Sequence, residues 1–143
     1  MDSVSRDKLK QKGFKRLINS FKFANDGIKY AFKYEQNIIV HLTVAIIVLF
    51  AGFFFNISVT EWLIIFMTIG LVVATELINT SIEALVDLAS PNINDLAKIA
   101  KDTAAGAVLV FAITASIVGI IIFLPKIILL LQGGSLWEVA LLV

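Results

Sequence analysis

The stretch IIVHLTVAIIVLFAGFFF, from Ile38 to Phe55, decides the fold class of this chain. Only His41 and Thr43 interrupt its apolar run. Because a helix needs about 20 apolar residues to cross the hydrocarbon core of a bilayer, this length predicts a membrane span. Two more runs follow, one opening with WLIIFMTIGLVVA at Trp62 and one reading AAGAVLVFAITASIVGIIIFL from Ala104. The sequence therefore predicts three membrane crossings.

The composition agrees with a membrane protein. The 143 residues are 59% hydrophobic and 16% charged, with a mean hydropathy of +0.93. Soluble domains carry about 25% charged residues. The absence of cysteine excludes disulfides and thiolate catalysis, and a single histidine argues against histidine-rich metal chemistry.

Basic residues are concentrated before the first span. Nine of the twelve precede residue 38: Arg6, Lys8, Lys10, Lys12, Lys15, Arg16, Lys22, Lys29 and Lys33. Apolar residues recur among them at steps of three and four, as in Phe14, Leu17, Ile18 and Phe21. This pattern predicts an amphipathic helix over residues 1–34 that lies on the anionic membrane surface. The alternative is a solvated basic flank without a binding role.

The distribution of charge also predicts the orientation. Lys98 and Lys101 follow the second span, so eleven of the twelve basic residues fall on one side of the membrane. The positive-inside rule makes that side cytoplasmic and places the turn from Asn56 to Glu61, together with Lys126, outside. We expect one domain over residues 1–143, with spans at 36–56, 61–89 and 95–131 and a tail of unknown role at 132–143.

The second span carries an acidic stripe. At 100° per residue, Glu76, Glu83 and Asp87 share one helix face, with Asn79 about 60° from Glu76. An ionisable group inside the membrane is expensive unless it is paired, hydrated or bound to a cation, which indicates a functional site. A helix end that emerges into water would also account for Asp87, but it accounts poorly for Glu76.

Cationic residues follow on the same side of the membrane. Lys101 and Asp102 are adjacent at the start of the third span, and phosphate oxygens bind both lysine and magnesium, while magnesium binds carboxylates. Positive-inside topology alone is the alternative explanation for the two lysines. Glu35 is either a further carboxylate on the metal side or a boundary charge. The chain has no GxxxxGK[ST], GxGxxG, HRD or DFG motif, so a kinase would need another design.

The segments ELINTSIEALVDL (Glu76 to Leu88) and LAKIAKDTAAGAV (Leu96 to Val108) resemble the signature of the prokaryotic diacylglycerol kinase family. EQNIIVH (Glu35 to His41), EWLIIF (Glu61 to Phe66) and IIFLPK (Ile121 to Lys126) resemble its undecaprenol kinase branch. His41 departs from the diacylglycerol branch, which tends to an acidic residue there. The resemblance covers roughly residues 12–127 and does not extend to the tail.

The resemblance implies a homotrimer of three-span protomers, with active sites shared between subunits. It implies that Glu76 is the general base and that Glu35 and Glu83 are the magnesium-associated carboxylates. We expect Glu76 and Asn79 to bind the lipid substrate. The expected nucleotide-binding residues are Arg16, Gly27, Glu35, Asn79, Glu83, Asp87, Lys101 and Asp102.

We therefore predict an all-α membrane lipid kinase of the bacterial cytoplasmic membrane, with its N-terminus in the cytoplasm. Its co-substrate is ATP, its cofactor is Mg²⁺, and its acceptor is a membrane lipid alcohol, with no role for nucleic acid. Undecaprenol is the preferred acceptor and diacylglycerol the alternative. A non-enzymatic membrane subunit that binds cations is the competing class.

Overall fold

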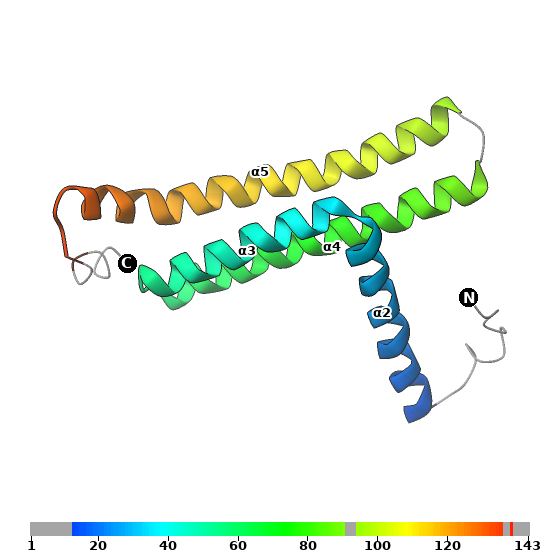
Figure 1. Ribbon diagram of the computed structural model, residues 1–143, viewed down its shortest axis with the longest axis horizontal. Coiled ribbons are helices and arrows are strands. Elements are labelled where there is room, and N and C mark those ends of the chain that lie inside the picture. The colour runs from blue at the N-terminus through cyan, green and yellow to red at the C-terminus, as the bar shows by residue number, and fades with distance from the viewer. Residues whose placement is uncertain (1–12, 91–93, 136–137, 139–143) are drawn as a thin grey trace. The chain divides into compact units, whose positions relative to one another are not determined.

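The computed structural model describes residues 13–90, 94–135 and 138. Their regular structure is entirely helical (Figure 1): α2 (Phe14–Tyr34), α3 (Gln36–Phe54), α4 (Val59–Ala89) and α5 (Asp95–Leu131). The chain divides into two compact units, Met1–Glu35 and Gln36–Val143. The first unit contains α2 and the second contains α3, α4 and α5. The two units are described separately below.

Helix α2 occupies part of the predicted surface segment. It begins after Gly13, whose φ of 91° is accessible to glycine, and it ends where the backbone N–H of Glu35 donates to the Ala31 carbonyl oxygen. Phe14 and Phe21 are exposed. Residues 1–12, with four of the basic residues, lie outside the described residues. That α2 lies on a membrane surface stays a prediction.

A tight turn joins α3 to α4. Helix α3 ends at Phe54, two residues before the predicted boundary, because Asn56 has a φ of 49° that no α-helix accommodates. Ser58 then caps α4 in a reciprocal capping box with Glu61, so α4 begins at Val59 rather than at 61. The two helices meet at Gly52, where a Cβ atom would come within 2.7 Å of the Trp62 ring. Only glycine permits this close approach.

Helices α4 and α5 run antiparallel along most of their length (Figure 1). Near the α3–α4 turn they enclose a core cluster of Phe55, Ile57, Ile65, Ile122 and Phe123. Asn94 caps α5 by accepting a hydrogen bond from the Leu96 N–H at 2.8 Å. The helix continues through Pro125 to Leu131, as predicted.

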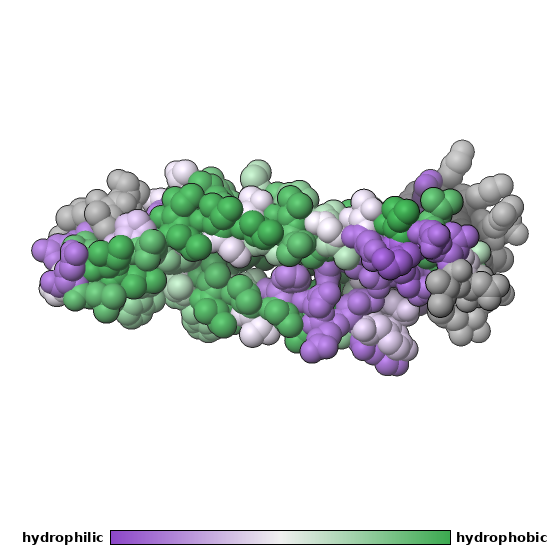
Figure 2. Space-filling view, turned by 90° about the horizontal axis from the view of Figure 1, so that it is seen from above, coloured by the Kyte–Doolittle hydropathy of each residue, from purple (hydrophilic) through white to green (hydrophobic). Residues whose placement is uncertain are grey.

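All three helices of the second unit are long and apolar enough to cross a membrane. Hydrophobic residues cover much of the visible surface of these spans in Figure 2. Large apolar side chains such as Phe50, Met67 and Ile121 are exposed along them. Such surfaces are stable in contact with lipid or with other membrane helices. The prediction of three helices with the length and apolar character of membrane spans is confirmed.

Candidate active site

One face of α4 carries the predicted acidic stripe. Helical geometry places Glu76, Asn79 and Glu83 within about 40° of one line along this helix, and Asp87 continues the same face. Glu76 and Asn79 are buried, with exposed fractions of 1% and 4%. Glu83 follows Glu76 by seven positions, which corresponds to about 10 Å along the axis. The two carboxylates therefore lie too far apart to coordinate one small ion together through direct contacts.

Glu76 is the deepest of these acids in the hydrophobic part of α4. It lies one turn after Val72, which is also buried, and the hydroxyl of Thr80 donates to the Glu76 backbone carbonyl at 3.0 Å. A helix end emerging into water does not explain an acid that is 1% exposed. Because an ionisable side chain inside a membrane helix is energetically costly and usually has a function, Glu76 is a candidate functional residue.

Asn79 links the buried part of the stripe to its more accessible end. Its side-chain amide nitrogen donates to Oε1 of Glu83 at 3.1 Å, one turn along the helix. Its Oδ1 atom is buried and accepts no hydrogen bond from the described part of the chain. This bond orients the Glu83 carboxylate and leaves an amide oxygen as a potential ligand.

Two ion pairs lie where the C-terminal end of α4 meets the N-terminal end of α5. Lys101 Nζ lies 2.6 Å from Oδ1 of Asp87 across the two helices. Lys98 Nζ lies 3.1 Å from Oδ2 of Asp102 along α5. Thus Lys101 contacts Asp87 rather than its sequence neighbour Asp102. These side chains are partly or largely exposed, so the pairs contribute little stability and remain available to a phosphate.

The predicted site residues of the first unit lie in or directly after α2. Arg16 is in the first turn of α2, Gly27 is in its middle, and Glu35 is its C-cap. Their approach to the stripe on α4 stays a prediction. A Cβ atom built on Gly27 would meet no heavy atom within 4 Å, so close packing does not account for this glycine.

The acidic stripe offers oxygen atoms of the kind that magnesium binds. Within the described ranges, no three histidine or acidic residues are close enough to hold a metal ion by themselves. Magnesium commonly uses one or two carboxylates together with substrate phosphates and water. Glu83 and the uncommitted Oδ1 of Asn79 are oxygen donors of this kind. The residues present therefore fit a magnesium ion carried in with a nucleotide.

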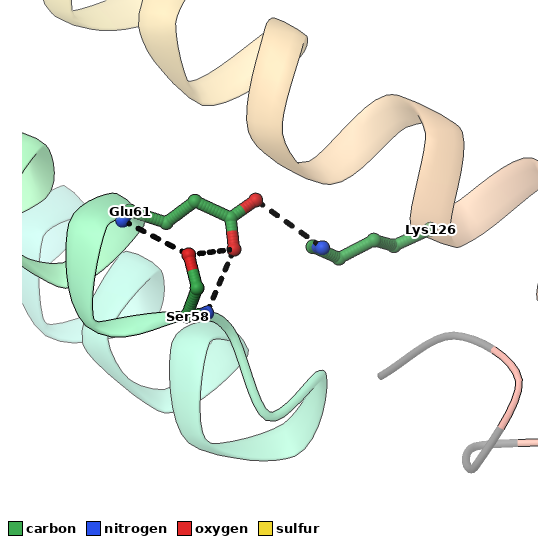
Figure 3. Close-up of polar contacts among 3 residues, drawn as sticks. All are labelled: Ser58, Glu61 and Lys126. Atoms are coloured by element: carbon green, nitrogen blue, oxygen red, sulfur yellow. Dashed lines mark hydrogen bonds and ion pairs between the residues drawn. The ribbon is translucent and has the colours of Figure 1, made fainter. Parts of the chain in front are cut away.

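A second polar cluster lies at the other end of the spans and was not predicted (Figure 3). Lys126 on α5 is 1% exposed, and its Nζ lies 3.2 Å from Oε1 of Glu61 on α4. Oε2 of Glu61 accepts hydrogen bonds from the Ser58 N–H and hydroxyl, at 2.8 and 3.0 Å. The spacing S-x-x-E in the sequence could have predicted the helix cap. No sequence pattern near Glu61 indicated that Lys126 would be its partner.

Three membrane-type helices with a buried carboxylate, an amide and cationic residues near one end define a membrane protein with an intramembrane polar site. Comparison with known proteins identifies its family. The model of the prokaryotic diacylglycerol kinase family matches residues 22–123, and the chain belongs to this family of membrane lipid kinases. It is accordingly a multi-pass membrane protein.

Individual relatives carry two names. An undecaprenol kinase from Bacillus subtilis is 47% identical over 111 residues, which are 78% of this chain and 90% of that protein. A diacylglycerol kinase from Synechocystis is 39% identical over 116 residues, or 80% of this chain and 66% of the relative. A diacylglycerol kinase from Haemophilus influenzae is 33% identical over 112 residues, or 78% of this chain and 92% of the relative.

Proposed function

We propose that this protein is an undecaprenol kinase that transfers the γ-phosphoryl group of ATP to the hydroxyl of undecaprenol. The observation that carries the proposal is the buried carboxylate of Glu76, which lies on the same face of a membrane helix as Asn79 and Glu83. In this proposal, Glu76 is the base at the depth of the lipid hydroxyl. The groups that bind the nucleotide lie farther along the same face, nearer to water. The 47% identity to a protein named undecaprenol kinase supports the choice of lipid.

The reaction forms a bond between the lipid oxygen and the γ-phosphorus and breaks the bond from that phosphorus to the β,γ-bridging oxygen. Glu76 accepts the proton of the lipid hydroxyl, and ADP leaves with the electron pair of the broken bond. Burial suits this role, because it keeps bulk water away from the carboxylate and leaves the lipid hydroxyl as its proton donor. Asn79, one turn away, binds the reacting headgroup through its side-chain amide.

The remaining residues hold and orient ATP. Lys101 and Asp102 contact the phosphates and their counter-ion, and Asp87 holds Lys101 at 2.6 Å in a defined position. When bound, magnesium neutralises charge on the ATP phosphates. Glu83 and Glu35 are the carboxylates that would hold it. Arg16 and Gly27 border the nucleotide from the N-terminal helix.

The assembly and location belong to the same proposal. The protein is a homotrimer in the bacterial cytoplasmic membrane, its N-terminus is cytoplasmic, and its active sites are shared between protomers. The basic residues before residue 38 and the pair Lys98 and Lys101 support this orientation.

Diacylglycerol is a second candidate acceptor, because several relatives are named diacylglycerol kinases. The deciding experiment offers undecaprenol and diacylglycerol at equal mole fractions to the purified protein in bilayers with radiolabelled MgATP. We expect labelled undecaprenyl phosphate to dominate. Labelled phosphatidic acid as the main product would contradict the choice of lipid, and no labelled lipid at all would contradict the kinase. Glu76→Gln protein is the matched blank.

A further inference from the structure

A groove of about 590 Å³ runs between α3, α4 and α5, entirely within the second unit. On α5 its lining extends from Ala112 to Ile127, which is about 20 Å of helix. On α4 it extends from Ile65 to Val73. The groove therefore follows the spans for roughly two thirds of a hydrocarbon core about 30 Å thick.

One end of the groove lies about one helical turn from the proposed active site. Val72 and Val73 line its end on α4, and Glu76 follows them by one helical turn. Helical geometry places Ile65, Val72 and Glu76 within about 40° of one another around the axis. One face of α4 is thus apolar along the groove and acidic beyond it, which matches a lipid alcohol with its hydroxyl at Glu76.

The groove surface is almost wholly apolar. Three polar side chains line it: His41, Thr68 and Ser116. The hydroxyl of Thr68 donates to the carbonyls of Ile64 and Ile65, and that of Ser116 donates to the carbonyl of Ala112. Both hydroxyls are therefore committed to their own helices, and no lysine, arginine, aspartate or glutamate lines the groove, which suits a hydrocarbon chain.

The position and the lining of the groove point to its occupant. The groove is apolar along its length, and one end lies one helical turn from Glu76, where the proposed function places the hydroxyl of a lipid alcohol. We infer that the groove holds a single isoprenoid chain and that it contacts only the part of the lipid next to the hydroxyl. This inference rests on the proposed function.

Two consequences follow for substrate choice. A single groove accommodates one chain, so it favours a prenol over a lipid with two acyl chains at the same headgroup. A prenol longer than the groove must leave it and continue into the bilayer. The part outside is surrounded by lipid tails in both the free and the bound state, so it adds nothing to recognition.

The first test is a series of prenols from farnesol to undecaprenol, each supplied in bilayers and expressed as mole fraction. We expect kcat/KM to rise with chain length and then to become constant for chains longer than about 20 Å, the length of the groove. A rise that continues to the full length of undecaprenol, or no dependence on length, would overturn the inference.

The second test fills the groove. Gly119 lines it, and a Cβ atom at Gly119 would meet no heavy atom within 4 Å, so Gly119→Leu places its side chain in open space. Gly70 on α4 is equally open but is not among the groove residues, and Gly70→Leu is the matched control. We expect Gly119→Leu to lower kcat/KM for undecaprenol at least about tenfold, because one excess methylene in an apolar pocket has effects of that order. Gly70→Leu should change it much less.

An equal loss of kcat/KM in both variants would contradict the proposed role of the groove. The proposed kinase activity would still stand if the wild-type protein phosphorylates undecaprenol. If Gly119→Leu fails to fold, a prenol with a photoactivatable group on its second isoprene unit replaces it. Cross-links should map to the groove face of α5 between Ala112 and Ile127. Cross-links confined to other faces of the spans would contradict the inference.

Discussion

At the scale of single residues, the two glutamates of α4 have different surroundings and therefore different expected roles. Glu76 is 1% exposed and lies among apolar turns, whereas Glu83 lies farther along the helix and accepts a hydrogen bond from Asn79. A buried carboxylate suits proton transfer, and a more accessible one suits a hydrated cation and a nucleotide. Substitution by glutamine separates these roles because it keeps the side-chain volume.

Glu76→Gln should lower kcat by about 10²- to 10⁴-fold, the usual contribution of a general base, and leave MgATP affinity nearly unchanged. Removal of an expensive intramembrane charge should also leave the protein at least as stable in detergent. Turnover, nucleotide affinity and thermal unfolding of the one variant check this. Activity lost in proportion to stability would instead make Glu76 a structural residue, and Asp102 would become the next candidate base.

Glu83→Gln should weaken MgATP binding and abolish transfer, because a hard anionic ligand is lost. Calorimetric titration with MgATP, compared with titration with magnesium-free ATP, measures the effect. Ser81→Ala is the control: Ser81 is exposed on the same helix, and its hydroxyl bonds only to the Leu77 carbonyl among the described residues. Unchanged affinity in Glu83→Gln would refute the assignment.

At the scale of helices, α5 is tied to α4 at both ends by ion pairs of unlike character. The pair of Lys101 and Asp87 is partly exposed, whereas Lys126 is buried against Glu61. Exposed pairs contribute about 0–1 kcal/mol, but removal of one partner from a buried pair leaves an uncompensated charge. The buried pair therefore controls whether α5 stays in register with α4 at this end.

Lys126→Met should lower the free energy of unfolding by about 3 kcal/mol, because it strands the Glu61 carboxylate. The double variant Glu61→Gln with Lys126→Met should recover much of this loss, since glutamine still accepts the capping hydrogen bonds of Ser58. Lys98→Met, which removes an exposed partner of Asp102, is the control and should cost less than about 1 kcal/mol. Thermal unfolding in detergent ranks the three variants. A Lys126→Met protein as stable as Lys98→Met would show that the buried pair is energetically unimportant.

At the scale of the whole molecule, the absence of cysteine makes topology easy to measure. We expect cysteine at Asp95 to be labelled only from the cytoplasmic side and cysteine at Thr60 only from outside, as the basic residues require. Both positions are exposed and avoid the caps at Asn94 and Ser58. Impermeant maleimide on right-side-out and inverted vesicles gives the readout. Labelling of both positions from one side would refute three crossings.

The proposal that active sites are shared between protomers predicts complementation between inactive variants. Glu76→Gln and Lys101→Met alter α4 and α5 respectively, and each should be inactive alone. If a site combines α4 of one protomer with α5 of its neighbour, co-reconstituted mixtures should recover a fraction of wild-type turnover. The measurement needs differently tagged subunits, so that mixed oligomers are verified. Verified mixed oligomers without activity would place both residues of each site in a single protomer.

Much of this architecture was predictable because its causes are local in sequence. An apolar run as long as a bilayer is thick specifies a span without any knowledge of its neighbours, so three helices followed from three runs. Periodicity alone placed Glu76, Glu83 and Asp87 on one face, since the helical repeat converts spacing into angle. The family signature around Glu76 and Lys101 lies on these same helices.

Contacts between helices required the tertiary structure. The ends of α3 and α4 shifted by two residues because of the backbone of Asn56 and the cap at Ser58, which apolar counting does not register. Sixty-four residues separate Glu61 from Lys126, and only the antiparallel packing of α4 on α5 brings them together. The same packing pairs Lys101 with Asp87 and forms the groove beside Glu76. Sequence spacing determines what one helix presents, whereas the faces that meet depend on how three helices pack.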